Sequence, residues 1–231
     1  MAEWVTRISD RLSQSVLTDA EMKNNANCAR SILQLQMGWT IEAVCGALGN
    51  MQRESSLNAG ACETGKGTPR SGSLYYGGGL GLIQLTDYPP YTKQYVHPLL
   101  WYANYVSGNW WDGTLQCNML DYATDPTITD CGVGQGARWG WMQSSDYPST
   151  DFNTYRYGTL TVDQCTEYWY YCMEMHSTYT DNMVLRKSYA NYWYQYLSGE
   201  SPVPVDPTPT PPIYSSRKDM PIWMMCRRPY L

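Results

Sequence analysis

Glu54 is the residue of this chain whose type and setting best suit catalysis. It lies near the expected C-terminal end of a helix, and a glycine-rich segment follows at Gly77–Gln84. A glutamate that faces such a segment can be held protonated at neutral pH and can then act as a general acid, for example in cleavage of a sugar polymer. The pairing of these two segments is the strongest functional signal in the sequence.

The helix that should carry Glu54 begins near Thr40 and ends before Gly60. At about 100° per residue, Glu54 falls outside the apolar stripe and above a face of small side chains, which another backbone or a ligand could approach closely. The negative end of the helix dipole disfavours a carboxylate there, and burial would disfavour it further, as a general acid requires. An exposed glutamate at a frayed helix end is the alternative. The apolar stripe comprises Ile41, Val44, Cys45, Leu48 and Met51, and the small face comprises Ala43, Ala47 and Asn50.

The composition argues against several classes of function. A formal net charge of −5 is unsuited to a nucleic-acid groove, which needs a basic stripe. No run approaches the roughly 18 apolar residues of a membrane-spanning helix, and the first residues show no secretory signal. With 2 His and no Cys-x-x-Cys pair, we expect neither a metal site nor a cofactor. The 21 Tyr and 10 Trp supply rings that fill cores and also stack on sugars.

The 8 cysteines are scattered along the chain. In a chain without an export signal such cysteines are more often reduced and buried than bridged, although one or two disulfides formed after release from a cell are the alternative. Cys165 and Cys172 are two helical turns apart, so we expect them to share a packed face.

We predict an α+β fold, predominantly α, over residues 1–199. Residues 61–88 should form a small β-hairpin and loop, because glycines break any helix there. Residues 125–158 should be irregular, and we expect them to wall a cleft. The last helix is expected to bury Val184, Ala190, Trp193 and Leu197. The other expected helices run from the capping box at Thr18 to Gly38, from Pro98 to Gly108, from Thr114 to Tyr122, from the capping box at Thr161 to about Met175, and from Thr180 or Asp181 to Leu197.

The C-terminal segment differs in kind from the domain. Residues 200–212 are rich in proline and predict an extended linker of polyproline II character. Residues 213–231 are too few to form a core, and their apolar cluster flanked by arginines suggests a peptide that docks on a partner, with disorder as the alternative.

Two motifs carry a resemblance to known enzymes. Glu54-Ser55 followed by Gly81-Leu82-Ile83-Gln84 resembles the paired motifs of goose-type lysozymes and lytic transglycosylases. The wider context, from Leu48-Gly49-Asn50-Met51 to a late helix with Arg186, Ala190 and Trp193, is similar to the phage tail lysozyme family over about residues 20–198. The resemblance implies a lysozyme-like helical domain in which a small β-hairpin forms the second wall of the cleft.

The resemblance also implies a reaction. Glu54 would protonate the glycosidic oxygen between N-acetylmuramic acid and N-acetylglucosamine in peptidoglycan. Hydrolysis by inversion needs a second carboxylate roughly 6.5–9.5 Å away, and Glu63 is the candidate, followed by Asp87. Lytic transglycosylases need only one glutamate, so that alternative stays open. The substrate-binding candidates are Ser55, Gln84, Asp87 and Tyr88.

The family's setting implies where the protein acts. Its members serve in virion tails, where local wall digestion precedes DNA delivery, and virion parts assemble in the host cytoplasm. We therefore expect residues 213–231 to bind other phage tail proteins. A structural tail protein with the same fold and little activity, and a freely released endolysin, are the rival interpretations.

Overall fold

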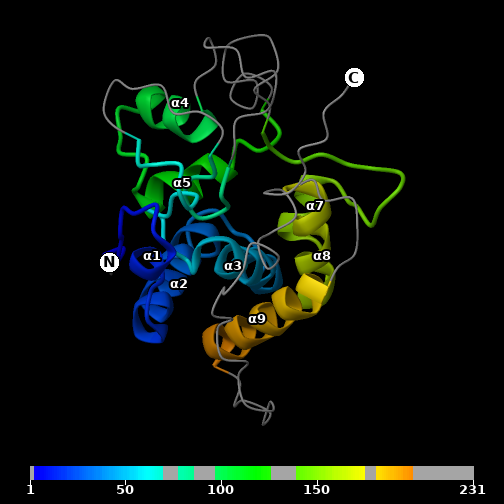
Figure 1. The fold of residues 1–231 in the computed structure, drawn as a ribbon. Coiled ribbons are helices and arrows are strands. Elements are labelled where there is room, and N and C mark those ends of the chain that lie inside the picture. Colours follow the sequence, from blue (N-terminus) through cyan, green and yellow to red (C-terminus); the bar gives the residue numbers. More distant parts are fainter. Residues whose placement is uncertain (1–2, 70–77, 86–96, 126–138, 175–180, 200–231) are drawn as a thin grey trace.

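The computed structural model describes residues 3–69, 78–85, 97–125, 139–174 and 181–199 (Figure 1). These residues are mostly helical, which confirms the predominantly α class. None of their helices combines the length and the apolar character needed to cross a membrane. In chain order the helices are α1 (Leu12–Ser15), α2 (Asp19–Leu33), α3 (Ile41–Ser55), α4 (Pro98–Tyr105), α5 (Gly113–Leu120), α7 (Phe152–Tyr157), α8 (Val162–Cys172) and α9 (Asp181–Ser198).

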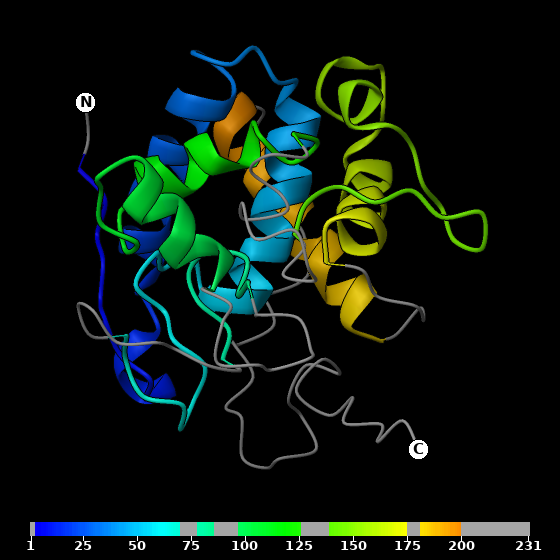
Figure 2. The ribbon, with the colours of Figure 1, turned by 90° about the horizontal axis from the view of Figure 1, so that it is seen from above.

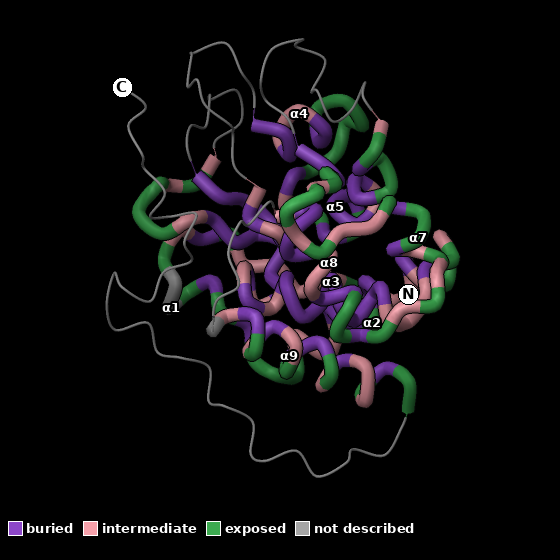
Figure 3. The backbone as a smooth tube through the Cα atoms, turned by 90° about the vertical axis from the view of Figure 1, so that its right-hand side faces the viewer, coloured by how far each residue is buried: buried purple, intermediate pink, exposed green. Residues whose placement is uncertain are grey.

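Helix α3 is the centre of the structure. Figure 2 shows it between α2 and α5 on one side and α7 and α8 on the other. Its most extensive contacts are with α9 and then with α8. Most of α3 is buried, whereas α9 keeps an exposed side, as the colours of Figure 3 show. The helix that carries Glu54 is therefore enclosed by its neighbours along most of its length.

Two glycines of α3 allow this close packing. A Cβ atom on Gly46 would lie 2.6 Å from the Cβ of Cys165 on α8. A Cβ atom on Gly49 would lie 2.6 Å from the carbonyl oxygen of Arg186 on α9. These glycines lie beside the predicted small face rather than on it. At that face Nδ2 of Asn50 donates to the backbone carbonyl of Thr166 on α8 at 3.1 Å, so another backbone does approach it, as predicted.

The helix ends follow the capping signals of the sequence. Thr18 and Thr161 each form the expected capping box, with Glu21 and Gln164 as the respective partners. Helix α3 ends at Ser55 because the next residue adopts the left-handed conformation, with φ of 54°. Glu54 therefore lies in the last turn of α3, as predicted.

Two expectations about the helices were wrong. Val184 is 63% exposed rather than buried, because the buried stripe of α9 is displaced from it by one residue. The segment 125–158 is not wholly irregular, since Asp151 caps the short helix α7 by accepting a hydrogen bond of 2.9 Å from Thr154 N. The buried stripe of α9 comprises Met183, Arg186, Ala190, Trp193 and Leu197, at helical spacing.

The expected β-hairpin is present in the described residues only as isolated antiparallel bridges. These join Cys62 to Leu80 and Leu80 to Leu85. The parts of the expected hairpin at 70–77 and 86–88 lie outside the described residues, as do the proline-rich linker at 200–212 and the C-terminal peptide at 213–231.

The cysteines of the described residues are core side chains. Six of them are buried in the thiol form, and Cys165 and Cys172 of α8 are both fully buried, as expected of a shared packed face. Burial raises the pKa of the Cys165 thiol to about 12, so this thiol is unreactive at neutral pH.

We predict that Gly49→Ala destabilises the protein. The added methyl group would meet the backbone of α9, which cannot move aside as a flexible side chain can. The cost should therefore be about 2–3 kcal/mol, the upper part of the range for overpacking. Alanine regains about 1 kcal/mol through its higher helix propensity, so the free energy of unfolding should fall by about 1–2 kcal/mol in urea titrations. Ser188→Ala, at an exposed position of α9, should have almost no effect. Equal stability of the two variants would contradict the close packing of α3 and α9.

Candidate active site

The side chain of Glu54 is buried against α9. Its carboxylate accepts a hydrogen bond from Nη2 of Arg186, and the side chains of both residues are 2% exposed. The close approach of the two helices at Gly49 places the carboxylate and the guanidinium in contact. The expected burial of Glu54 is therefore confirmed, and the exposed alternative is excluded.

Arg186 has further partners. Its Nη1 donates to Oδ1 of Asn50 and to Oε2 of Glu174, both at 2.8 Å. Burial alone would lower the pKa of this guanidinium, but the negative charges of Glu174 and Glu54 outweigh burial and raise the pKa. Arg186 is therefore a permanent cation in the core, held between two carboxyl groups from different parts of the chain.

Sequence reasoning missed this cation as a partner of Glu54. The signal was present, because Arg186 occupies a position of the apolar stripe of α9 where an arginine would be buried. A buried arginine needs an acidic partner. From the sequence, Arg186 was recognised only as part of the late helix, and Val184 rather than Met183 was expected in the buried stripe.

Ser55 joins the two sequence motifs. Its hydroxyl donates to the carbonyl oxygen of Leu82 at 2.8 Å, with the carbonyl of Met51 as an alternative acceptor at 3.0 Å. The Glu-Ser motif at the end of α3 therefore contacts the Gly81–Gln84 turn directly, although 27 positions separate Ser55 from Leu82. This turn is held at the helix end that carries Glu54.

A buried glutamine shapes the same turn. Oε1 of Gln116 on α5 accepts a hydrogen bond from Leu82 N at 2.7 Å, and its Nε2 donates to Ala59 O at 2.7 Å. Gly81 has φ of 77°, and a Cβ atom there would collide with the Gln116 amide. Gln84 donates within the turn, from Nε2 to the carbonyl of Gly81 at 2.9 Å. The glycine and the glutamine of this motif are thus required by the shape of the turn.

A family model described as phage tail lysozyme matches residues 24–197, which is most of the chain. The chain belongs to the phage tail lysozyme family. The match agrees with the resemblance over about residues 20–198 and includes Glu54, Ser55, Gln84 and Arg186. Membership of this family indicates a phage-associated, lysozyme-like protein that degrades peptidoglycan.

In this member of the phage tail lysozyme family, Glu63 faces the start of the turn. Its backbone N–H donates to Gly79 O at 2.8 Å, and its Oε2 accepts from Gly79 N at 3.0 Å. The residue is partly exposed. Glu63 thereby fixes the entry to the turn, while Asp87 and Tyr88 lie outside the described residues.

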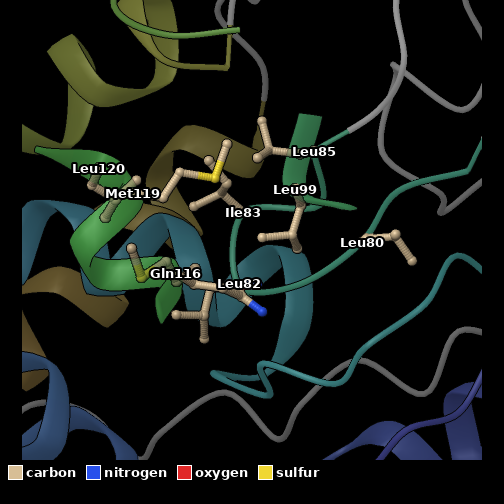
Figure 4. Close-up of a pocket in the computed structure, with 9 residues that line it drawn as sticks. Leu80, Leu82, Ile83, Leu85, Leu99, Gln116, Met119 and Leu120 are labelled. Atoms are coloured by element: carbon tan, nitrogen blue, oxygen red, sulfur yellow. Dashed lines mark hydrogen bonds between the residues drawn. The ribbon is translucent and has the colours of Figure 1, made fainter. Parts of the chain in front are cut away.

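A pocket of this lysozyme-like domain lies beside the turn, between α3, α4 and α5 (Figure 4). Its lining is apolar except for Gln116 and does not include Glu54, so it suits core packing better than a saccharide, which needs polar partners. No cluster of metal-binding side chains occurs in the parts of the chain that the structure describes. The lining residues are Met51, Leu80, Leu82, Ile83, Leu85, Leu99, Gln116, Met119 and Leu120.

His97 connects the turn to α4 through two hydrogen bonds. Its Nδ1 accepts from Leu99 N at 3.2 Å as the N-cap of α4, and its Nε2 donates to Leu85 O at 2.6 Å. Burial lowers the pKa of His97 to about 4, so the imidazole is neutral in the folded protein. The sequence indicated the helix start through Pro98 but not this role of His97.

We predict that His97 makes the protein less stable in acid. Between its ordinary pKa of 6.5 and its folded pKa of about 4, the unfolded chain binds a proton that the folded protein does not. The stability that the neutral His97 imidazole contributes is therefore fully present above pH 6.5, and this contribution is lost as the pH falls toward 4. From about pH 7.5 to about pH 4.5, the unfolding free energy of the wild type should fall by about 2–3 kcal/mol more than that of His97→Gln. Parallel pH profiles in urea titrations would contradict this assignment.

Proposed function

We propose that this protein is a muramidase of a phage tail that cleaves the β-1,4 bond between N-acetylmuramic acid and N-acetylglucosamine, with Glu54 as the general acid. The observation that carries the proposal is the junction of Glu54-Ser55 with the Gly81–Gln84 turn through the Ser55–Leu82 hydrogen bond. It brings the two motifs of the family together beside a carboxyl group that is 2% exposed.

The first step is protonation of the glycosidic oxygen. Because Arg186 donates to Oε1 of Glu54, we assign the transferred proton to Oε2. Proton transfer lets the leaving sugar depart as an alcohol while positive charge develops on the ring that remains. The contact with Arg186 fixes the orientation of the Glu54 carboxyl group, which the transfer requires.

The second step needs a group that completes the reaction. In a hydrolase we assign Glu63 as the base that activates water, a role supported by its place beside Gly79 at the start of the turn. In a lytic transglycosylase the acetamido group of the sugar would attack in place of water, and Glu63 would only hold the loop. Ser55 and Gln84 would act by holding the turn against which the substrate binds. Asp87 and Tyr88 remain substrate-binding candidates from the sequence and lie outside the described residues.

The family also supports a proposal about the place of action. We assign the enzyme to the virion tail, where it would open the wall locally before DNA ejection, with residues 213–231 docked on other tail proteins. A structural tail protein with the same fold is the second candidate. The contact of the Glu54-Ser55 end of α3 with the Gly81–Gln84 turn supports the enzyme.

We predict that Glu54→Gln abolishes the cleavage of purified peptidoglycan. The amide keeps the shape of the side chain but cannot deliver a proton, so the rate should fall by at least about 100-fold. Glu42→Gln, at the other end of α3, should retain near wild-type activity. Circular dichroism establishes that both variants are folded. Full activity of folded Glu54→Gln would refute the acid assignment.

The masses of the wild-type products decide between the two reactions. Hydrolysis should release muropeptides with reducing ends, whereas transglycosylation should release anhydro-muropeptides that are lighter by one water. Anhydro products would remove the need for Glu63 as a base. The absence of both products would favour the structural tail protein.

We predict that deletion of residues 200–231 leaves cleavage intact but removes the protein from assembled phage particles. The deleted residues follow the segment that matches the family, so the catalytic domain should keep its fold. Immunoblots of purified particles measure incorporation, and peptidoglycan release measures activity. Unchanged incorporation of the shortened protein would refute docking through this segment.

A further inference from the structure

Four charged side chains meet where α3, α8 and α9 pack together. These are Arg53, Glu54, Glu174 and Arg186, and their formal charges sum to zero. The Glu174 side chain is 6% exposed, and Glu54 and Arg186 are 2% exposed. Arg53 is 8% exposed and donates to Oδ1 of Asn182 at 3.0 Å. Water is therefore almost excluded from the cluster, and each charge depends on the others for stabilisation.

Arg186 divides its hydrogen bonds between the two acids. Its Nη2 contacts Glu54, and its Nη1 contacts Glu174 at 2.8 Å. Glu174 follows the end of α8 and so approaches the guanidinium from a different part of the chain than Glu54, which belongs to α3. The Tyr170 ring lies 5.0 Å from the guanidinium carbon. The two carboxylates are thus connected through one shared cation.

Stability alone does not account for this arrangement. Replacement of a buried ion pair or triad by apolar side chains is often neutral or stabilising, because the pair must be desolvated. Arg186 lies in a stripe whose other members include Met183, Ala190 and Trp193, so an apolar side chain would suit the position. The cluster must therefore be considered for its effect on the chemistry of Glu54.

We propose that Glu174 is a positioning residue for the reaction: its carboxylate balances the charge of Arg186, so that Glu54 can take up a proton without leaving an uncompensated cation in the core. The inference rests on the proposed role of Glu54 as general acid. When Glu54 is ionised, Arg186 has two carboxylate partners. After proton uptake by Glu54, it keeps a complete ion pair with Glu174.

The other groups around Arg186 do not replace Glu174. On α3 these are Arg53, which is a cation, and the neutral amide of Asn50. Tyr170 on α8 presents its ring to the guanidinium rather than a carboxylate. Tyr189 on α9 lies near Arg53, and burial raises the pKa of its hydroxyl. Among the described residues around this cation, Glu174 supplies the second negative charge.

The test is the pH dependence of peptidoglycan cleavage by full-length variants. A general acid works in its protonated form, so activity is lost as the pH rises through the basic limb of the profile. Glu174→Gln removes a negative charge and leaves a net positive cluster, which disfavours the proton on Glu54. The basic limb should therefore move to lower pH by about one unit. Glu174→Asp keeps the charge and should stay within about 0.3 unit of the wild type.

A second variant tests the same idea if Glu174→Gln does not fold. The double variant Glu174→Gln/Arg186→Gln replaces the ion pair by two amides and restores a net charge of zero together with Glu54 and Arg53. Its basic limb should lie at the wild-type pH or above it. A limb below that of the wild type would overturn the proposal.

The remaining outcomes separate this inference from the proposed function. If Glu174→Gln lowers the melting temperature but leaves the pH profile unmoved, Glu174 is only a structural partner of Arg186 and the inference fails. An equal shift in Glu174→Asp and Glu174→Gln would also overturn it, because geometry rather than charge would then be responsible. Activity of folded Glu54→Gln would instead defeat the proposed function itself.

Discussion

The buried guanidinium of Arg186 is the interaction on which the rest of the site depends. A permanent cation that is 2% exposed is stable in the core only with acidic partners close by. Its position on α9 therefore determines that Glu54 of α3 and Glu174 after α8 turn inward toward the same point. Gly46 and Gly49 make the arrangement possible, because only residues without a side chain let the backbones of α8 and α9 come so near to α3.

The contact with this cation gives Glu54 a different environment from that of an isolated general acid. In the simplest arrangement of a general acid, an apolar pocket keeps a carboxyl group neutral by desolvation. Here the buried carboxyl group is in contact with a cation that also pairs with Glu174, so Glu54 belongs to a cluster of charges rather than to an apolar pocket. The turn on the other side contributes geometry, since Ser55, His97 and Gln116 hold it in place through buried hydrogen bonds.

Much of the fold could be predicted from local signals. The capping boxes at Thr18 and Thr161, the small face of α3 and the place of Glu54 in its last turn all depend on residues close together in the sequence. What escaped prediction depends on contacts between distant segments. The pairing of Glu54 with Arg186 spans 132 positions, and no local pattern connects the two residues.

The same distinction between local and distant residues applies to the candidate site. The contact between the two motifs was expected, because both belong to a pattern that resembles known enzymes. The polar side chains that fix the turn were not expected. His97 is 12 positions from its partner Leu85, and Gln116 is 34 positions from its partner Leu82. Neither residue belongs to a recognisable motif. Buried polar groups of this kind are identified only when their partners are known.

The most direct test of the account is a crystal structure of the Glu54→Gln variant with a bound oligosaccharide of alternating N-acetylglucosamine and N-acetylmuramic acid. The account predicts that the oxygen of the scissile bond lies within hydrogen-bonding distance of the side-chain amide at position 54, with the sugar chain against the Gly81–Gln84 turn and Arg186 still paired with Glu174. An oligosaccharide bound at a distance from residue 54 and from this turn would contradict it.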